Sequence, residues 1–355
     1  MDLGLTEIQQ MLKTSAQDFL SRECPLTLVR EMEDDPRGFT DQLWRQMINL
    51  GWTGVAFPEQ YGGTGGNFAD LGVLLEEIGR SLAPAPFFST VVLGGMTILD
   101  AGSDAQKDDL ISRICAGTII MTMAVPEAAA AYEPWDIQAT ASQQGDGYEI
   151  TGTKLFVPDA EAADMIIVAV RTSSGQDPAE GVSLFLVPSG AAGLTIIPMQ
   201  SVGNERVFEV SLDKVSVPAD SAIGTVGEAW PIIERSIQRA TAAQCIQMLG
   251  GAEAVLDMTV EYAKGRTQFG RAIGTFQAVQ HHCARMATDV EGSKGVAFQA
   301  VWRLSEGLPA KREVAMAKAW IGPAYRRVCA TAHQCHGAIG FTKEHDLQLY
   351  TRRAK

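Results

Sequence analysis

The chain has 355 residues, of which 46% are hydrophobic and 20% charged, a balance typical of a globular protein with more than one packed unit. Its formal net charge of −13 repels nucleic-acid phosphates and anionic membranes, so we expect no nucleic-acid partner. The start, MDLGLTEIQQ, lacks the basic and apolar segments of a signal peptide, and no apolar run approaches the ~20 residues of a membrane span. We therefore expect a cytoplasmic protein.

The first third of the chain is predicted to be helical. Apolar residues recur at helical spacing within residues 5–22, 43–50 and 71–82. Between the last two lies GWTGVAFPEQYGGTGG, residues 51–66, whose many turn residues predict a structured loop. We expect an N-terminal α-helical domain over residues 1–119.

The middle third is predicted to be a sheet, residues 120–226. Short segments rich in apolar or β-branched residues are separated by Gly, Pro, Asp and Ser; they cover residues 121–125, 148–157, 165–170, 183–187, 194–199 and 208–217. Phe208, Val210 and Leu212 alternate as a strand with one buried face requires. Because no helical segment intervenes, an antiparallel barrel or sandwich is favoured.

From residue 227 to residue 355 the helical period returns and predicts a helix bundle. One apolar stripe contains Ile246, Leu249 and Ala252, and another contains Phe276 and Met286.

The six cysteines form no CxxC pair, which is typical of a reducing compartment. His281 and His282 precede Cys283, but no second ligand cluster has metal-site spacing, so we expect no metal.

Three motifs carry candidate binding chemistry. In YAKGRTQFG, residues 262–270, the planar fork of Arg266 suits a pyrophosphate; the alternative is a helix C-cap that ends at Gly270. In QCHGAIGF, residues 334–341, Gly337 permits close backbone approach to a ligand; the alternative is a simple helix end. In GTKLFVP, residues 152–158, Phe156 can form a wall against an aromatic ring such as isoalloxazine; the alternative is a core residue.

Five segments together, in the same order, resemble the acyl-CoA dehydrogenase family over nearly the whole chain. They are PEQYGGTGG (58–66), YEITGTKLFVPDAEAAD (148–164), LDKVSVP (212–218), YAKGRTQFGRAIGTFQAVQ (262–280) and QCHGAIGFTKEHDLQLYTRRAK (334–355). The resemblance implies an α+β multidomain fold: an N-terminal helical domain, a central antiparallel β-barrel and a C-terminal helix bundle that here lacks its last helix. It also implies FAD between barrel and bundle, with a neighbouring subunit completing the site.

The resemblance further implies roles for particular residues. Arg266 and Phe269 would meet the FAD pyrophosphate and adenosine across a subunit interface, together with Gln277, Gln334 and Gly337. The flavin ring would be lined by Met123, Ala124, Phe156 and Val157. The implied reaction is α,β-dehydrogenation of an acyl-CoA thioester, in which a base removes the Cα proton and hydride leaves Cβ for flavin N5. The implied partners are an electron-accepting flavoprotein and further subunits in a dimer or tetramer, with a paralogous catalytic subunit as one alternative.

The chain departs from the family around the flavin. The usual Thr-Glu-Pro is here Val-Pro-Glu at residues 125–127, and the serine of the following turn has no match. Phe156 stands where the family has Trp, and Pro158 where it has a Thr whose hydroxyl reaches the flavin. Proline offers neither an N–H nor a hydroxyl, which leaves that hydrogen bond without its donor.

The catalytic base is the largest departure, and we leave the catalytic residue unassigned. The family's carboxylate usually lies several residues beyond an Arg-Asp-Ala-Lys stretch, which here is residues 352–355, the end of the sequence. The alternative place on the first long bundle helix holds Ala240 and Thr241. The other acids in relevant segments are interpreted as loop or helix-surface charges: Glu127, Glu234 and Asp346.

Two hypotheses follow: a dehydrogenase whose sequence is cut short or whose base cannot be located from the sequence, or a base-less FAD-binding subunit paired with a catalytic one. We expect slow or no turnover by this chain alone, because a positioned base contributes roughly 10²–10⁴-fold. A nicotinamide-dependent oxidoreductase is rejected, since the glycines at 62–66 and 94–95 do not sit in a strand, G-x-G-x-x-G, helix unit.

Overall fold

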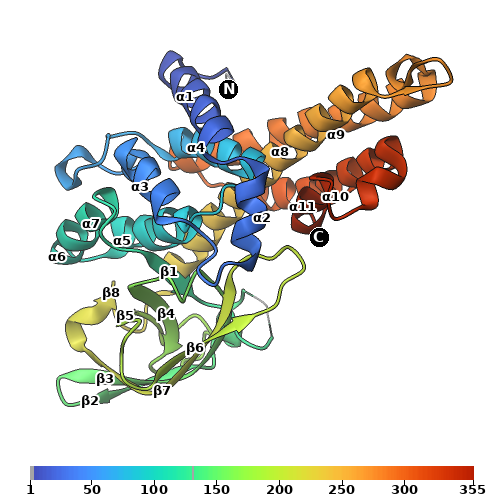
Figure 1. The fold of residues 1–355 in the computed structure, drawn as a ribbon. Coiled ribbons are helices and arrows are strands. Elements are labelled where there is room, and N and C mark those ends of the chain that lie inside the picture. Colours follow the sequence, from blue (N-terminus) through green and yellow to red (C-terminus); the bar gives the residue numbers. More distant parts are fainter. Residues whose placement is uncertain (1–3, 130–131) are drawn as a thin grey trace.

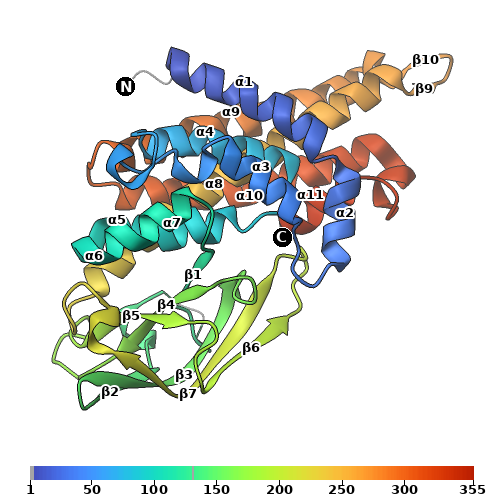
Figure 2. The same cartoon turned by 60° about the vertical axis from the view of Figure 1, so that its left-hand side comes forward.

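A computed structural model describes residues 4–129 and 132–355 (Figure 1). Helices come first, a sheet follows, and helices return. In both views the helices gather on one side of the sheet (Figures 1 and 2). The predicted order of an N-terminal helical part, a central sheet and a C-terminal bundle is confirmed.

The N-terminal helices begin where the sequence supplies capping side chains. The Thr6 hydroxyl accepts a hydrogen bond from the Gln9 N–H, and the Gln9 side chain accepts one from the Thr6 N–H. Asn67 and Asp70 cap the fourth helix in the same reciprocal way. These helices are α1 (Glu7–Glu23), α2 (Leu26–Asp34), α3 (Asp41–Asn49), α4 (Phe68–Ser81), α5 (Met96–Ala101), α6 (Asp104–Gln106) and α7 (Ser112–Cys115). The loop at residues 51–66 is ordered around buried Trp52 and Phe57, as predicted.

The sheet has the strand order β6-β7-β3-β2-β4-β5-β8, with β1 paired to β4. Its strands are β1 (Met121–Ala124), β2 (Thr140–Gln144), β3 (Gly147–Pro158), β4 (Met165–Arg171), β5 (Val182–Pro188), β6 (Leu194–Met199), β7 (Val207–Pro218) and β8 (Ala222–Ile223). Most pairs are antiparallel, as predicted, but β1 runs parallel to β4, and so does the start of β2 where Thr140 pairs with Arg171. Strand β2 was not predicted, because only Ala141 of its five residues is buried and no apolar alternation marks it.

The bundle contains α8 (Trp230–Gly265), α9 (Gln277–Ser305), α10 (Lys311–His336) and α11 (Leu347–Arg353). Ile246, Leu249 and Ala252 are buried, which confirms the predicted stripe. The N-terminal helices, the bundle and part of the sheet share one apolar core, whereas the sheet interior holds a second. No helix in residues 4–129 or 132–355 is long and apolar enough to cross a membrane.

Candidate functional site

A cavity of about 660 Å³ lies where the N-terminal helices, the sheet and α8 meet. Because residues from all three parts of the chain line it, the cavity depends on how they pack together. Its lining includes Phe87, Met123, Phe156, Pro158, Ala240 and Thr241.

Phe156 reaches this cavity because β3 is irregular at that point. The pairing of β3 with β7 shifts register between Lys154 and Val157, and Phe156 adopts a left-handed φ of 55° between them. Its side chain is 48% exposed, so the interpretation of Phe156 as a core residue is wrong. The ring is available as one wall of a binding site.

Of the other three residues expected around the flavin, one has its side chain at the cavity and two have their side chains buried in the sheet. Met123 lines the cavity. Ala124 and Val157 are fully buried within the sheet interior, so only their backbone groups can approach a ligand.

The residues predicted to bind pyrophosphate and adenosine lie away from the cavity, at the far end of the bundle. Arg266 is the C-cap of α8, with its N–H donating to the Tyr262 carbonyl at 2.8 Å. The predicted helix end is therefore present, but it lies at Gly265 and not at Gly270, which is part of the hairpin that follows. Its guanidinium is exposed and has no partner among the described residues. Phe269 is 91% exposed in the hairpin of β9 (Thr267–Gln268) and β10 (Arg271–Ala272), which projects from the bundle (Figure 2).

The end of α10, with Gln334 and Gly337, lies beside Arg266 and the end of α8. The Tyr262 ring stacks on His336 with centroids 4.4 Å apart, which brings the ends of α8 and α10 together. Gln334 is exposed, and Gly337 caps α10 with a φ of 66° and open space where a side chain would stand. Gln277 begins α9. The predicted residues thus form two groups, one at the cavity and one at the bundle end, that a single chain does not bring together.

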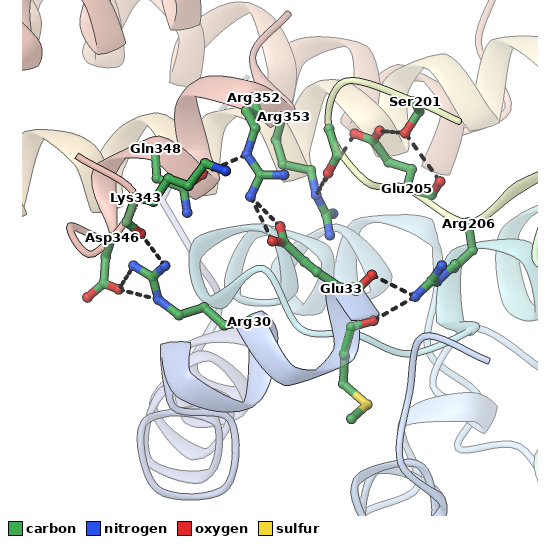
Figure 3. Close-up of polar contacts among 12 residues, drawn as sticks. Arg30, Glu33, Ser201, Glu205, Arg206, Lys343, Asp346, Gln348, Arg352 and Arg353 are labelled. Atoms are coloured by element: carbon green, nitrogen blue, oxygen red, sulfur yellow. Dashed lines mark hydrogen bonds and ion pairs between the residues drawn. The ribbon is translucent and has the colours of Figure 1, made fainter. Parts of the chain in front are cut away.

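Four residues that line the rim of the cavity, Glu33, Glu205, Arg206 and Arg353, take part in polar contacts, which Figure 3 draws. The Arg352 guanidinium on α11 donates to both oxygens of Glu33 on α2, at 2.6 and 2.8 Å. Arg206, just before β7, donates to the carbonyl oxygens of Met32, Glu33 and Asp35. The rim therefore joins the last turn of α2 to both the sheet and the last helix.

The acids singled out from the sequence do not line the cavity. Glu127 lies in the loop after β1, as expected, but it is buried and pairs with fully buried Lys154 at 2.6 Å, so its interpretation as a surface charge is wrong. Glu234 pairs with Lys311 and Asp346 with Arg30. The carboxylates that do line the cavity, Glu33, Asp159 and Glu205, were missed because nothing in their spacing marks them.

The lining fits a flavin in part. Phe156 offers an aromatic face, and the unpaired Arg266 guanidinium suits a pyrophosphate from another copy. Pro158 supplies no donor, and its carbonyl accepts the Thr122 hydroxyl at 2.6 Å. Ala240 and Thr241 face the cavity and bring no carboxylate to it. No group of three or more metal-ligating side chains occurs in the described part of the chain.

Comparison with known proteins agrees with this architecture. Family models described as the N-terminal, middle and C-terminal domains of acyl-CoA dehydrogenase match residues 6–118, 122–215 and 227–355. The probable acyl-CoA dehydrogenase YngJ of Bacillus subtilis (strain 168) is 30% identical over 100% of this chain and 94% of its own length.

Two solved structures show the same fold. Butyryl-CoA dehydrogenase from Megasphaera elsdenii has a TM-score of 0.92 at 28% identity, covering 100% of this chain and 94% of that one. A chain of the ChsE4-ChsE5 complex from Mycobacterium tuberculosis has a TM-score of 0.91 at 30% identity, covering 100% and 93%. The chain therefore belongs to the acyl-CoA dehydrogenase family, whose flavoprotein members are oxidoreductases that use FAD.

Proposed function

We propose that this protein catalyses the α,β-dehydrogenation of an acyl-CoA thioester. The observation that carries the proposal is the cavity itself, which combines the Phe156 wall with apolar walls in a chain of this family. FAD, when bound, supplies the acceptor for the hydride that leaves Cβ.

The chain's own residues would bind and orient the acyl group. Phe87, Phe88 and Leu93 line the cavity from the N-terminal helices, and Ile237 lines it from α8. Burying an acyl chain against these side chains excludes water from the thioester, which strengthens every polar interaction made there.

We propose that a second copy completes the FAD site. Support comes from the separation of the two residue groups and from two exposed side chains at the bundle end. The Arg266 guanidinium has no partner among the described residues, and Phe269 is 91% exposed although its ring meets that of Phe276 edge-on. Reoxidation of the reduced flavin would require an electron-accepting flavoprotein as partner.

Purification gives the first test of this function. The protein, purified with FAD in the buffer and then desalted, is expected to keep about one noncovalently bound FAD per chain, released by acid and quantified by its absorbance. A folded, colourless oligomer that takes up no FAD would contradict the proposal.

A second candidate function is a base-less subunit of a hetero-oligomer. It is favoured by Ala240 and Thr241, which leave the α8 side of the cavity without a carboxylate, and by the likeness to a chain solved in the ChsE4-ChsE5 complex. Co-expression with neighbouring genes separates the two functions: FAD retained only in the presence of a paralogous chain favours the subunit, and FAD retained by this chain alone favours the enzyme.

A further inference from the structure

Asp159 is a cavity-lining carboxylate with no role yet assigned. It follows Pro158 at the end of β3 and adopts a left-handed φ of 52°. Its N–H donates to the Arg206 carbonyl at 2.9 Å, which fixes the turn against the rim of the cavity.

One oxygen of this carboxylate is anchored and the other is not. The hydroxyl of Ser89, in the π-helical segment Phe88–Gly95, donates to Oδ2 at 2.6 Å. Ser89 is fully buried, and its hydroxyl also lies 3.1 Å from the Pro86 carbonyl, a longer contact than that with Oδ2. In the part of the chain that the structure describes, Oδ1 accepts no hydrogen bond and neither oxygen lies in an ion pair, which leaves Oδ1 available to a ligand in the cavity.

The two arginines whose charges act on Asp159, Arg353 and Arg206, form their hydrogen bonds with other groups. Arg206 donates to the backbone at the end of α2, and Arg353 donates to the Gly203 carbonyl and approaches Glu205 at 3.9 Å. Burial raises the pKa of Asp159 to about 6, while the Ser89 hydrogen bond and the charges of Arg353 and Arg206 oppose that rise. A carboxyl group with a pKa near the working pH is suited to accept a proton.

The other two carboxylates that line the cavity are less suitable. Glu33 already accepts contacts on both of its oxygens from Arg352, at 2.6 and 2.8 Å. Glu205 is 43% exposed and accepts the Ser201 hydroxyl at 2.9 Å. Asp159 is therefore the carboxylate that combines desolvation, a fixed orientation and an oxygen without a partner.

We propose that Asp159 is the base that removes the Cα proton of the acyl-CoA. The proton would pass to Oδ1, and the electron pair of the Cα–H bond would become the new carbon–carbon π bond. FAD, when bound, would supply the acceptor for the hydride that leaves Cβ. This inference rests on the proposed function, and it replaces the expectation that the chain carries no base.

The test is exchange of the Cα proton with solvent, which requires the base but no net oxidation. The FAD-loaded chain is incubated anaerobically in D₂O with butyryl-CoA and with octanoyl-CoA, and deuterium at Cα is measured by mass spectrometry. Asp159→Asn keeps the volume and the Ser89 bond, and asparagine tolerates a left-handed φ. We expect its exchange rate to fall at least about 100-fold while FAD content is unchanged. Glu161→Gln, an exposed acid two residues away, is the control and should exchange like the wild type.

Thermal melting of the FAD-free protein gives a readout that is independent of turnover. A buried carboxylate that serves catalysis costs stability, so Asp159→Asn should melt no lower than the wild type at pH 8. A purely structural Asp159 would give a lower melting temperature. Ser89→Ala, which removes the anchor alone, should exchange at a rate between those of the wild type and Asp159→Asn.

Three results would overturn the inference. Asp159→Asn or Ser89→Ala could exchange at the wild-type rate, or the wild type could bind FAD and butyryl-CoA without any exchange. In each of these cases the proposed binding of FAD and thioester still stands. A chain that binds no FAD overturns the proposed function and this inference together.

Discussion

Among single substitutions, we expect the largest loss of stability from breaking the buried pair of Lys154 and Glu127. Lys154 is fully buried and donates to Glu127 at 2.6 Å and to the Val125 carbonyl at 3.2 Å. Replacing Lys154 with Met leaves the Glu127 carboxylate buried without its cation. We expect a loss of about 3 kcal/mol or more in the free energy of unfolding, measured by urea denaturation.

The control for Lys154→Met is Arg37→Met. Arg37 pairs with Asp41 at 2.9 Å, but both side chains are 54% exposed, so removing the pair should change stability by less than about 0.5 kcal/mol. Equal effects of the two substitutions would show that burial does not govern the Lys154 contact.

Single residues also mark where sequence reasoning stops. The reason Phe156 faces the cavity is a register shift against β7, which depends on a strand some fifty residues later and leaves no local pattern. Asp159 was missed for a related reason: a lone acid after a proline is typical of any turn. Backbone irregularity and tertiary burial created both features.

At the scale of elements, two acids lie where α4 meets α8: Glu76 on α4 and Glu253 on α8. Glu253 lies near Glu76, Lys13 and Lys294, and burial, together with the charge of Glu76, raises its pKa above the ordinary value of 4.5. A carboxyl group whose pKa is raised by folding stabilises the fold fully below 4.5, and that contribution is lost as pH rises through the folded pKa. Glu253→Gln should therefore reduce the decline in stability above pH 4.5. Urea denaturation at several pH values measures the free energy of unfolding of both proteins. If that free energy falls with pH as steeply in Glu253→Gln as in the wild type, the prediction is wrong. The control is Glu261→Gln, which changes an exposed acid.

The tether of α2 is a second property of an element. The Nη2 nitrogen of Arg206 lies within hydrogen-bond distance of three carbonyl oxygens at the end of α2, and the shorter lysine side chain would not carry its ammonium group to that position. Arg206→Lys should speed amide hydrogen exchange in α2 (Leu26–Asp34), whereas exposed Arg45→Lys on α3 should not. Wild-type protection of α2 in Arg206→Lys would mean that other contacts hold this helix.

The elements themselves were largely predictable. The alternation at 208, 210 and 212 predicted β7, and the stripe from Ile246 to Ala252 predicted α8, because in each the buried side chains recur at the period of the element. The parallel pairing of β1 with β4 was not predictable, since a short apolar strand carries no signal of its direction. Strand β2 was missed because its exposed face dominates its composition.

At the scale of the whole molecule, the bundle end should couple FAD binding to assembly. Arg266 is exposed and unpaired in the described chain, so in our proposal its guanidinium contacts the pyrophosphate of an FAD held by another copy. Arg266→Ala should weaken FAD retention by about 1.5–3 kcal/mol and shift the oligomer toward smaller species. Equilibrium dialysis and light scattering measure the two effects. The control is Lys264→Ala, which removes a cation paired with Glu261 on the same helix end and should change neither FAD retention nor oligomer size. If Arg266→Ala also leaves both quantities unchanged, Arg266 is only a helix cap.

Anaerobic reduction of the bound flavin tests the central claim most directly. The FAD-loaded chain, without any partner, is mixed with butyryl-CoA, octanoyl-CoA and branched acyl-CoAs while the visible flavin absorbance is followed. Our account predicts that at least one thioester bleaches the flavin, and that Asp159→Asn, loaded with the same FAD, bleaches at least about 100-fold more slowly. An FAD-loaded wild-type chain that binds the thioesters and stays oxidised with all of them would contradict the account.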